Sequence, residues 1–523
     1  MNVDVRQETA AQPKGQPAGL WVLIFTETWE RWSHYGMRAI LILYLTAPAA
    51  LGGLGLDKQR AAGIFGGYLL AIYLFALSGG QIADRFLGAK RTIVLGGLLI
   101  AAGQILLQVR TLNGLVASLV LIAIGTCLLK PNVSASVGRL FTKEDPRRDG
   151  AFTYEYMGIN LGAMLAPIFC GYMAEQPTFI AFLKRLGLSS PSGWAWAFGL
   201  SGFGMLAGLI VFALFRHHIV DVNLPEGQKE VAPRGTGFLF ILVPVLLAAA
   251  WMVIGGGIWP VQLVGGAAAS IGIMAIVGWL LKRGHIQGRA TASGPAGDPA
   301  AEPTLGPEDM RRLGVVGLML CFSMTFWAVF QQAGSSLNLF AKEYTQRVIF
   351  GFEVPAAWFQ SVNALGIILL GSVFAWLWTR RAGKWPSSPV KFALALMFAA
   401  LGFYLLVPAS LIAQGTPGQV TRVSMGWLAG VYTFHTIGEL CLSPVGLSYV
   451  SKLAPKHMSS QLMGAWFFAT GLGSYLAGKA AGLMGQIPLW QLFGACATVA
   501  LVASLLLWIV VSPIIRRLMG GHS

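Results

Sequence analysis

The stretch Phe25-Thr26-Glu27-Thr28-Trp29-Glu30-Arg31-Trp32-Ser33-His34-Tyr35-Gly36-Met37-Arg38 lies inside the first long apolar segment, residues 19–50. A segment of this length can cross a bilayer, which takes about 20 apolar residues. Turning the helix by about 100° per residue puts six polar side chains within about 140° of one another. This polar stripe consists of Glu27, Glu30, Arg31, His34, Tyr35 and Arg38.

The charges of the stripe indicate what surrounds the polar side of this helix. A charge in hydrocarbon costs several kcal/mol, so the stripe is expected to face a bundle interior or a water-filled cavity. The alternative is that the charges pair with one another only to hold the fold. Two acids and two bases exceed what packing needs, and this favours a functional site.

The composition is that of a polytopic, all-α membrane protein. The chain has 523 residues, of which 55% are hydrophobic and 11% charged, whereas soluble domains average about 25% charged residues. The first apolar segment is too long and too acidic for a cleaved signal peptide. Fourteen spans are predicted, at 20–50, 58–83, 90–109, 115–139, 150–174, 194–215, 237–255, 259–282, 311–341, 356–379, 389–412, 424–450, 459–484 and 488–513.

The net charge of +16 does not indicate a nucleic-acid partner. With the N-terminus inside, most Lys and Arg residues fall in segments on the cytoplasmic side, as the positive-inside rule requires. Both termini are therefore predicted to be cytoplasmic, and the basic charge needs no nucleic acid to explain it.

Catalytic and metal-binding patterns do not stand out. The five cysteines all lie in predicted spans without a CxxC pair, as small core residues do. No Gly-rich nucleotide loop follows a strand, and no Ser/His/Asp or metal-ligand spacing appears. The sequence predicts neither an enzyme nor a bound cofactor or metal.

Further charges lie within later spans. Lys130 sits well inside the span 115–139 and needs an anionic partner or a wet cavity, and Glu27 or Glu30 is the expected partner. The neighbouring Pro131 can kink that helix. Together the central cations and acids leave one unbalanced negative charge, so either a carboxyl is protonated or a ligand completes the balance. These residues are Arg31, Arg38, Lys130, Glu27, Glu30, Glu155 and Glu439.

Several motifs together resemble the proton-dependent oligopeptide transporter family of the major facilitator superfamily. The resemblance covers residues 20–515, and the loop Gly79–Arg91 resembles a gating loop of that superfamily through Asp84 and Arg85. The other motifs are Glu27-x-x-Glu30-Arg31 with Tyr35-Gly36, Lys130-Pro131-Asn132, Tyr156-x-x-Ile159-Asn160-x-Gly162, Phe326–Ser335 and Gly438–Leu447.

The resemblance implies a major facilitator fold with a site between two six-helix halves. The halves are predicted at 19–216 and 311–515, with an inserted helix hairpin at 237–283. Cytoplasmic linkers are predicted at 217–236 and 284–310, and cytoplasmic tails at 1–18 and 516–523.

A zwitterionic peptide needs cations for its carboxylate and an anion for its amino group. Arg38 and Lys130 of the first half suit the carboxylate, and Glu439 of the second half suits the amino group. Glu27 and Glu30 are the proton candidates, tuned by Arg31 and paired with Lys130. Further cavity residues are expected to be Tyr35, Tyr73, Tyr156, Asn160, Trp327, Asn363, Trp427, Ser443 and Trp466. For each aromatic residue alone, simple helix packing is an equal alternative.

Three residues depart from the family pattern. Gln331 stands where many bacterial members have Glu, which puts more of the proton coupling on the first helix. Glu155 replaces an aromatic residue and is either an extra proton site or only a cavity-facing side chain. His34 replaces a common tyrosine, and packing is its favoured role.

The sequence therefore predicts a proton-coupled importer of di- and tripeptides, monomeric in a bacterial inner membrane, with the proton as its coupling ion. One alternative is a symporter of another anion, such as nitrate, or of a drug-like solute. Glu439 argues against a purely anionic substrate. The other alternative is a receptor that binds peptides without moving them, which would need no titrating carboxylates in its core.

Overall fold

The computed structural model describes residues 15–83, 87–142, 145, 147–188, 193–219, 307–380, 386–415, 419–453 and 459–518. The hairpin predicted at 237–283 lies outside these residues, as do Asp84, Arg85 and most of both predicted linkers. The described part therefore covers the two predicted halves and not the segment between them.

The first half is a bundle of long helices with short helical pieces at its ends. The first span ends at Thr46, before the predicted boundary at 50, because Ala47 is extended ahead of Pro48. The short α6 is absent from the sequence prediction. The elements are α1 (Ala18–Thr46), η1 (Ala49–Leu51), α2 (Lys58–Ile82), α3 (Ala89–Leu106), α4 (Leu112–Arg139), α5 (Arg147–Glu175), α6 (Pro177–Arg185), α7 (Trp194–Phe215) and η3 (Arg216–His218).

The second half repeats this plan with one break. The predicted span 311–341 is interrupted by the 3-10 turn η4 (Gln331–Gly334), which separates α10 from α11. The other elements are α10 (Pro307–Phe330), α11 (Ser336–Tyr344), η5 (Ala356–Trp358), α12 (Phe359–Arg380), α13 (Ser388–Ala413), α14 (Met425–Leu453), α15 (Ser459–Ala481), α16 (Leu489–Leu505), the π-helical η6 (Leu506–Val511) and α17 (Ser512–Leu518).

Four two-residue strands are a departure from the all-α prediction. β1 (Thr345–Gln346) pairs in parallel with β4 (Val423–Ser424). β2 (Val348–Ile349) and β3 (Phe352–Glu353) pair antiparallel as a hairpin. These strands lie in the connections before α12 and before α14, so they leave the helical bundle intact.

Eight helical stretches in the described ranges are long and apolar enough to cross a membrane. α1 is not among them, because its polar stripe places four charged side chains in one helix. The eight stretches are Ala89–Leu106, Leu112–Arg139, Gly150–Glu175, Trp194–His218, Glu308–Tyr344, Ala356–Trp378, Ser388–Ala413 and Leu489–Arg517.

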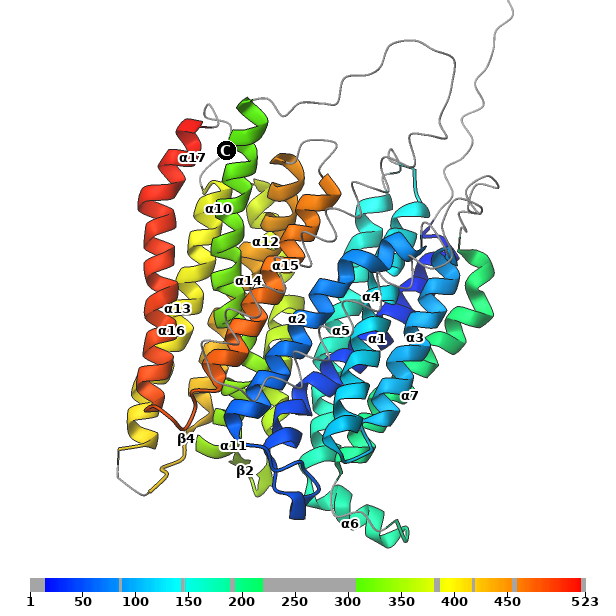
Figure 1. The fold of residues 1–523 in the computed structure, drawn as a ribbon, viewed down its shortest axis with the longest axis vertical. Helices are drawn as coiled ribbons and strands as arrows, with labels where there is room; N and C mark the ends of the chain where they lie inside the picture. The colour runs from blue at the N-terminus through cyan, green and yellow to red at the C-terminus, as the bar shows by residue number, and fades with distance from the viewer. Residues whose placement is uncertain are drawn as a thin grey trace, which may run out of the picture.

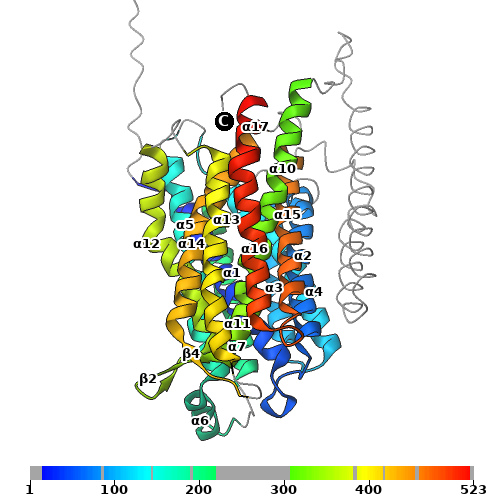
Figure 2. The ribbon, with the colours of Figure 1, turned by 90° about the vertical axis from the view of Figure 1, so that its left-hand side faces the viewer.

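The two halves lie side by side with their long helices running in a common direction (Figures 1 and 2). α2 packs against α15 and α5 against α12, so these two pairs join the halves. The hairpin β2–β3 and α6 lie at one end of the bundle, called here the α6 end, whereas α17 and the start of α10 lie at the opposite end (Figure 1).

Glycines hold the stripe-bearing helix close to its neighbours. A Cβ on Gly36 of α1 would lie 2.7 Å from the Cys170 sulfur of α5 and 2.8 Å from the Ser201 hydroxyl of α7. Small residues at such crossings let membrane helices approach closely. The close contact at Gly36 fixes the rotation of α1 about its own axis, and thereby the direction in which the nearby side chains of His34, Tyr35 and Arg38 point.

Candidate functional site

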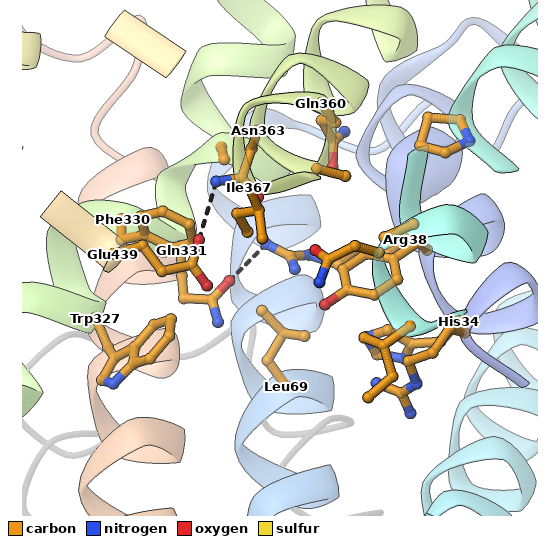
Figure 3. A pocket seen from close by; sticks show the side chains of 18 of the residues that line it. His34, Arg38, Leu69, Trp327, Phe330, Gln331, Gln360, Asn363, Ile367 and Glu439 are labelled. Carbon is orange, nitrogen blue, oxygen red and sulfur yellow. Dashed lines mark hydrogen bonds between the residues drawn. The ribbon is translucent and has the colours of Figure 1, made fainter. Parts of the chain in front are cut away.

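A cavity of about 150 Å³ lies between the two halves. The first half lines it with side chains of α1, α2, α4 and α5, and the second half with side chains of α10, η4, α12 and α14 (Figure 3). The site therefore sits at the interface between the halves.

Arg31 holds both acids of the α1 stripe. Its guanidinium lies 3.5 Å from a Glu27 carboxylate oxygen and forms an ion pair and a hydrogen bond with Glu30. Both carboxylates are 1% exposed and Arg31 is 4% exposed. One cation thus serves two buried acids, and of the three side chains only Arg31 lines the cavity.

The ring of Tyr35 lies between two cations. The guanidinium carbons of Arg31 and Arg38 are each 5.9 Å from the ring centroid, within the range of a cation–π interaction. Tyr35 therefore separates the acid-paired Arg31 from Arg38, which extends further into the cavity.

Arg38 joins the two halves through a neutral partner. Its Nη2 donates a 2.5 Å hydrogen bond to Oε1 of Gln331 in η4 (Figure 3). A Cβ on Gly334 would come within 2.5 Å of the Phe65 ring and 3.1 Å of Arg38 Nε. The break at η4 and its glycine therefore allow Arg38 to reach the second half.

Glu439 of α14 is the acid of the second half in this cavity. It accepts a 2.9 Å hydrogen bond from the Asn363 side-chain amide, which also donates to Thr436. Within the described ranges no cation lies at ion-pair distance from Glu439. Its carboxylate is therefore oriented by an amide and is free to take a cationic ligand group.

Lys130 of α4 lines the cavity as expected. The pair predicted between Lys130 and Glu27 or Glu30 is not formed, because Arg31 lies closer to both acids. Across the residues that the structure covers, Lys130 has no ion-pair partner. Its ammonium group is available to an anion in the cavity.

A family model described as the POT family matches residues 90–496. The chain belongs to the POT family. This result confirms the family that the sequence motifs predicted.

POT-family relatives match over almost the whole length. The peptide transporter YePEPT of Yersinia enterocolitica is 35% identical over 97% of this chain and 96% of its own length. A di-/tripeptide transporter of Lactococcus lactis is 32% identical over 97% of both chains. The crystal structure of a POT peptide transporter in complex with sulfate has a TM-score of 0.78 at 34% identity, covering 97% of this chain and 96% of that one.

Most of the predicted site residues of this POT-family chain meet around the cavity. Trp427, Ser443 and Trp466 do not line it, and the Trp466 ring packs at 6.1 Å against Phe392. Glu155 also lies outside the lining and accepts a 2.8 Å hydrogen bond from Ser134. The predicted residues that do line it are Arg31, Tyr35, Arg38, Tyr73, Lys130, Tyr156, Asn160, Trp327, Asn363 and Glu439.

His34 of the polar stripe lines the cavity and makes an edge contact with the Tyr35 ring at 5.1 Å between centroids, so packing is not its whole environment. Other polar lining residues are absent from the sequence prediction. They follow helical spacing: Gln360 lies three residues before Asn363, and Tyr432 and His435 lie seven and four before Glu439. Projecting each helix from its predicted polar residue would have found them.

Proposed function

We propose that this chain imports di- and tripeptides together with protons by alternating access of its two halves. The names of its relatives support the substrate class. The observation that carries the proposal is the polarity of the cavity: Arg38 and Lys130 come from the first half and Glu439 from the second.

The peptide backbone would span the interface between the halves. Its carboxylate would bind Arg38 and Lys130, and its ammonium group would bind Glu439, which Asn363 already orients. Tyr35, Tyr73, Tyr156 and Trp327 would form walls that tolerate varied side chains, and Asn160 would hydrogen-bond the backbone. Ser443 and Trp466, predicted to contact the peptide, would act only after a conformational change.

Proton uptake would take place on α1. With all groups ionised, the buried set of three cations and four acids carries one excess negative charge. A single proton on Glu27 or Glu30 removes that excess, and a zwitterionic peptide adds no net charge. Protonation of one acid leaves Arg31 paired with the other, while Lys130 stays available to the peptide. Glu155 would be an additional proton site near this group.

The membrane arrangement follows from the positive-inside prediction. The α6 end would face outward and both termini the cytoplasm of a bacterial inner membrane. The chain would be a monomer of 14 spans, with the helix hairpin at 237–283 between its halves and Asp84 and Arg85 in a cytoplasmic gating loop. It would have no enzymatic activity and need no cofactor besides the proton.

Contacts between the halves gather at the α6 end, which supports a conformation closed on that side. Lys342 pairs with Glu175 at 2.8 Å, and Lys58 pairs with Glu343 at 2.6 Å. The Trp358 indole N–H donates a 2.8 Å hydrogen bond to the Ile168 carbonyl. Alternating access requires these contacts to break when the cavity opens outward.

Reconstitution in proteoliposomes tests the function. Under an inward proton gradient, the full chain should concentrate labelled dialanine, and it should lose that capacity when the gradient is collapsed. A receptor would bind dialanine without concentrating it, and a symporter of another anion would ignore it. Either result would contradict the proposal.

A further inference from the structure

The hairpin β2–β3 ends in a turn that its sequence makes strained. Phe350 and Gly351 are its two central residues, with φ values of 48° and 80°. A two-residue hairpin of this kind requires left-handed backbone at both positions, for which Asn-Gly is the favoured sequence. Phe350 is the sole non-glycine residue with positive φ in the described ranges. A bulky side chain at this position is an outlier that points to a function.

The tip of this hairpin is apolar on all sides. Phe350 is fully exposed, and Val348, Ile349 and Phe352 are exposed as well. Because Val348 and Ile349 point to opposite faces of a strand, both faces of the hairpin carry apolar side chains. Such a cluster in water marks a surface that meets an apolar partner.

The hairpin is held rigidly despite its exposed tip. Arg347, at its base, is 3% exposed and pairs with Glu353 at 2.6 Å and with Glu175 of α5 at 3.7 Å. The Val354 N–H donates a 2.7 Å hydrogen bond to the Arg347 carbonyl. The Phe352 ring lies 5.7 Å from the Trp358 ring. The tip is therefore presented in a fixed position.

The hairpin continues the apolar outer surface of α12. The membrane-length stretch Ala356–Trp378 begins directly after it, and 17% of its most apolar window is buried. Leu365, Leu369 and Trp376 lie exposed along this helix. Figure 2 shows β2 projecting at the lower left edge of the bundle, near β4 and α6. The tip thus lies at the end of the molecule where the exposed apolar surface of α12 begins.

α6 adds positive charge at the same end. It exposes Phe182 beside Lys184 and Arg185, and Leu186 directly after the helix is exposed as well. The Gln176 side chain, directly before α6, donates a hydrogen bond to the Glu353 carbonyl of the hairpin. Apolar side chains beside cations suit the boundary between acyl chains and anionic headgroups. This combination favours a lipid surface over a soluble partner.

We propose that the β2–β3 tip is a membrane-interface anchor, in which Phe350 and its neighbours insert among the lipid headgroups at the α6 end. Insertion removes the side chains of Val348, Ile349, Phe350 and Phe352 from water. It also explains why a phenylalanine occupies a turn position that strains its backbone. α6 lies at the same boundary, with its cations toward lipid phosphates.

Spin-label accessibility tests this anchor in the reconstituted full chain. An Ile349→Cys variant carrying a nitroxide, in a Cys321→Ser, Cys496→Ser background, is placed in phosphatidylethanolamine–phosphatidylglycerol vesicles. Collisions with lipid-soluble oxygen are compared with collisions with a water-soluble nickel chelate. Gln486→Cys, in the exposed turn after α15 at the same end, is the matched control. The oxygen-to-nickel ratio should be several-fold higher at position 349.

Changes at Phe350 then separate anchoring from simple proximity. Phe350→Asn suits the left-handed turn and removes the ring, so it should bring the ratio at position 349 several-fold closer to the control. Phe350→Leu keeps an apolar side chain and should preserve the ratio. Equal ratios at 349 and 486, or no response to Phe350→Asn, would overturn the proposal. Nitroxide–nitroxide broadening that grows with protein density would assign the tip to a second copy instead.

Discussion

Helix α1 and the α10–η4 segment approach the cavity from opposite halves and meet at the Arg38–Gln331 hydrogen bond. Two arginines and one histidine of α1 line the cavity, and the same helix carries two buried acids. In the opposite segment, the lining residues Trp327, Phe330 and Gln331 are neutral. The charge chemistry is thus concentrated in one half, and the second half contributes Glu439.

The neutral partner changes what Arg38 can do. A carboxylate at position 331 would neutralise the guanidinium, but an amide oxygen leaves its charge uncompensated. Under the proposed function, Arg38 would therefore keep its full attraction for a peptide carboxylate. Under the proposed function, proton coupling would rest on α1 and its neighbour Lys130, and ligand orientation would involve both halves.

The largest expected effect comes from removing Arg31, the cation that pairs with both acids of the α1 stripe. Arg31→Leu leaves Glu27 and Glu30 buried without their partner and should lower the free energy of unfolding by about 3–5 kcal/mol. Thermal unfolding in detergent measures this loss. The triple variant that adds Glu27→Gln and Glu30→Gln should recover most of it. An unchanged unfolding midpoint in Arg31→Leu would mean that the stripe is not a coupled unit.

Neutralising either acid of α1, Glu27 or Glu30, should uncouple peptide transport from the proton gradient. Glu27→Gln or Glu30→Gln should reduce proton-driven accumulation of dialanine by roughly 100-fold, as expected for loss of a proton-transfer group. Counterflow exchange, which needs no net proton movement, should persist. If both variants still accumulate peptide, α1 does not carry the coupling proton.

The second half should affect recognition more than coupling. Glu439→Gln removes the anion opposite the peptide ammonium and should weaken dialanine binding by roughly 10-fold, the range for a hydrogen bond to a charged group. N-acetylated dialanine lacks that ammonium and serves as the matched ligand, with affinity unchanged. Equal losses for both ligands would argue against the assigned orientation.

A smaller effect is expected from Gln331→Glu. The introduced carboxylate would compete with the peptide for Arg38 and should lower dialanine affinity at neutral pH by a few-fold. Protonation of that carboxylate at acidic pH should restore affinity. Gln332→Glu, one residue along and hydrogen-bonded to Ser336 rather than Arg38, is the positional control. A pH-independent affinity in Gln331→Glu would show that Arg38 does not depend on residue 331.

The smallest effect lies far from the cavity, at the start of α5. Hydrogen bonds from the Arg147 side chain and backbone amide lower the pKa of Asp145 below its ordinary value. A lowered pKa stabilises the folded state above the unfolded value of about 3.9, and this contribution disappears as pH falls through the folded pKa. Hydrogen exchange at the first amides of α5 should therefore rise in acid, after correction for the intrinsic rate. Asp145→Asn should remove that pH dependence.

Helical periodicity predicted the polar stripe of α1, whereas Lys130 and Glu439 were predicted from charges inside apolar spans and Asn363 from the family resemblance. It did not predict that Arg31 rather than Lys130 would hold the acids, because this choice depends on side-chain reach between helices. Trp466 was expected in the cavity because aromatic residues serve both packing and binding, and its ring packs on Phe392 instead. The η4 break and the short α6 depend on tertiary contacts that an apolar span does not reveal.

Glu175 ties one end of α5 to the second half through ion pairs with Lys342 and Arg347. This residue ends the helix that also carries Asn160, and 15 residues of helix separate the two by about 22 Å. If α5 tilted by about 5° about a pivot at the cavity, Glu175 would move by about 2 Å. Helix shifts of this size accompany conformational switching in other proteins. Such a movement is comparable to the 2.8 Å contact that joins Glu175 to Lys342. If α5 tilts in this way under the proposed transport cycle, a small adjustment at Asn160 would be enlarged at Glu175 and would release this contact between the halves.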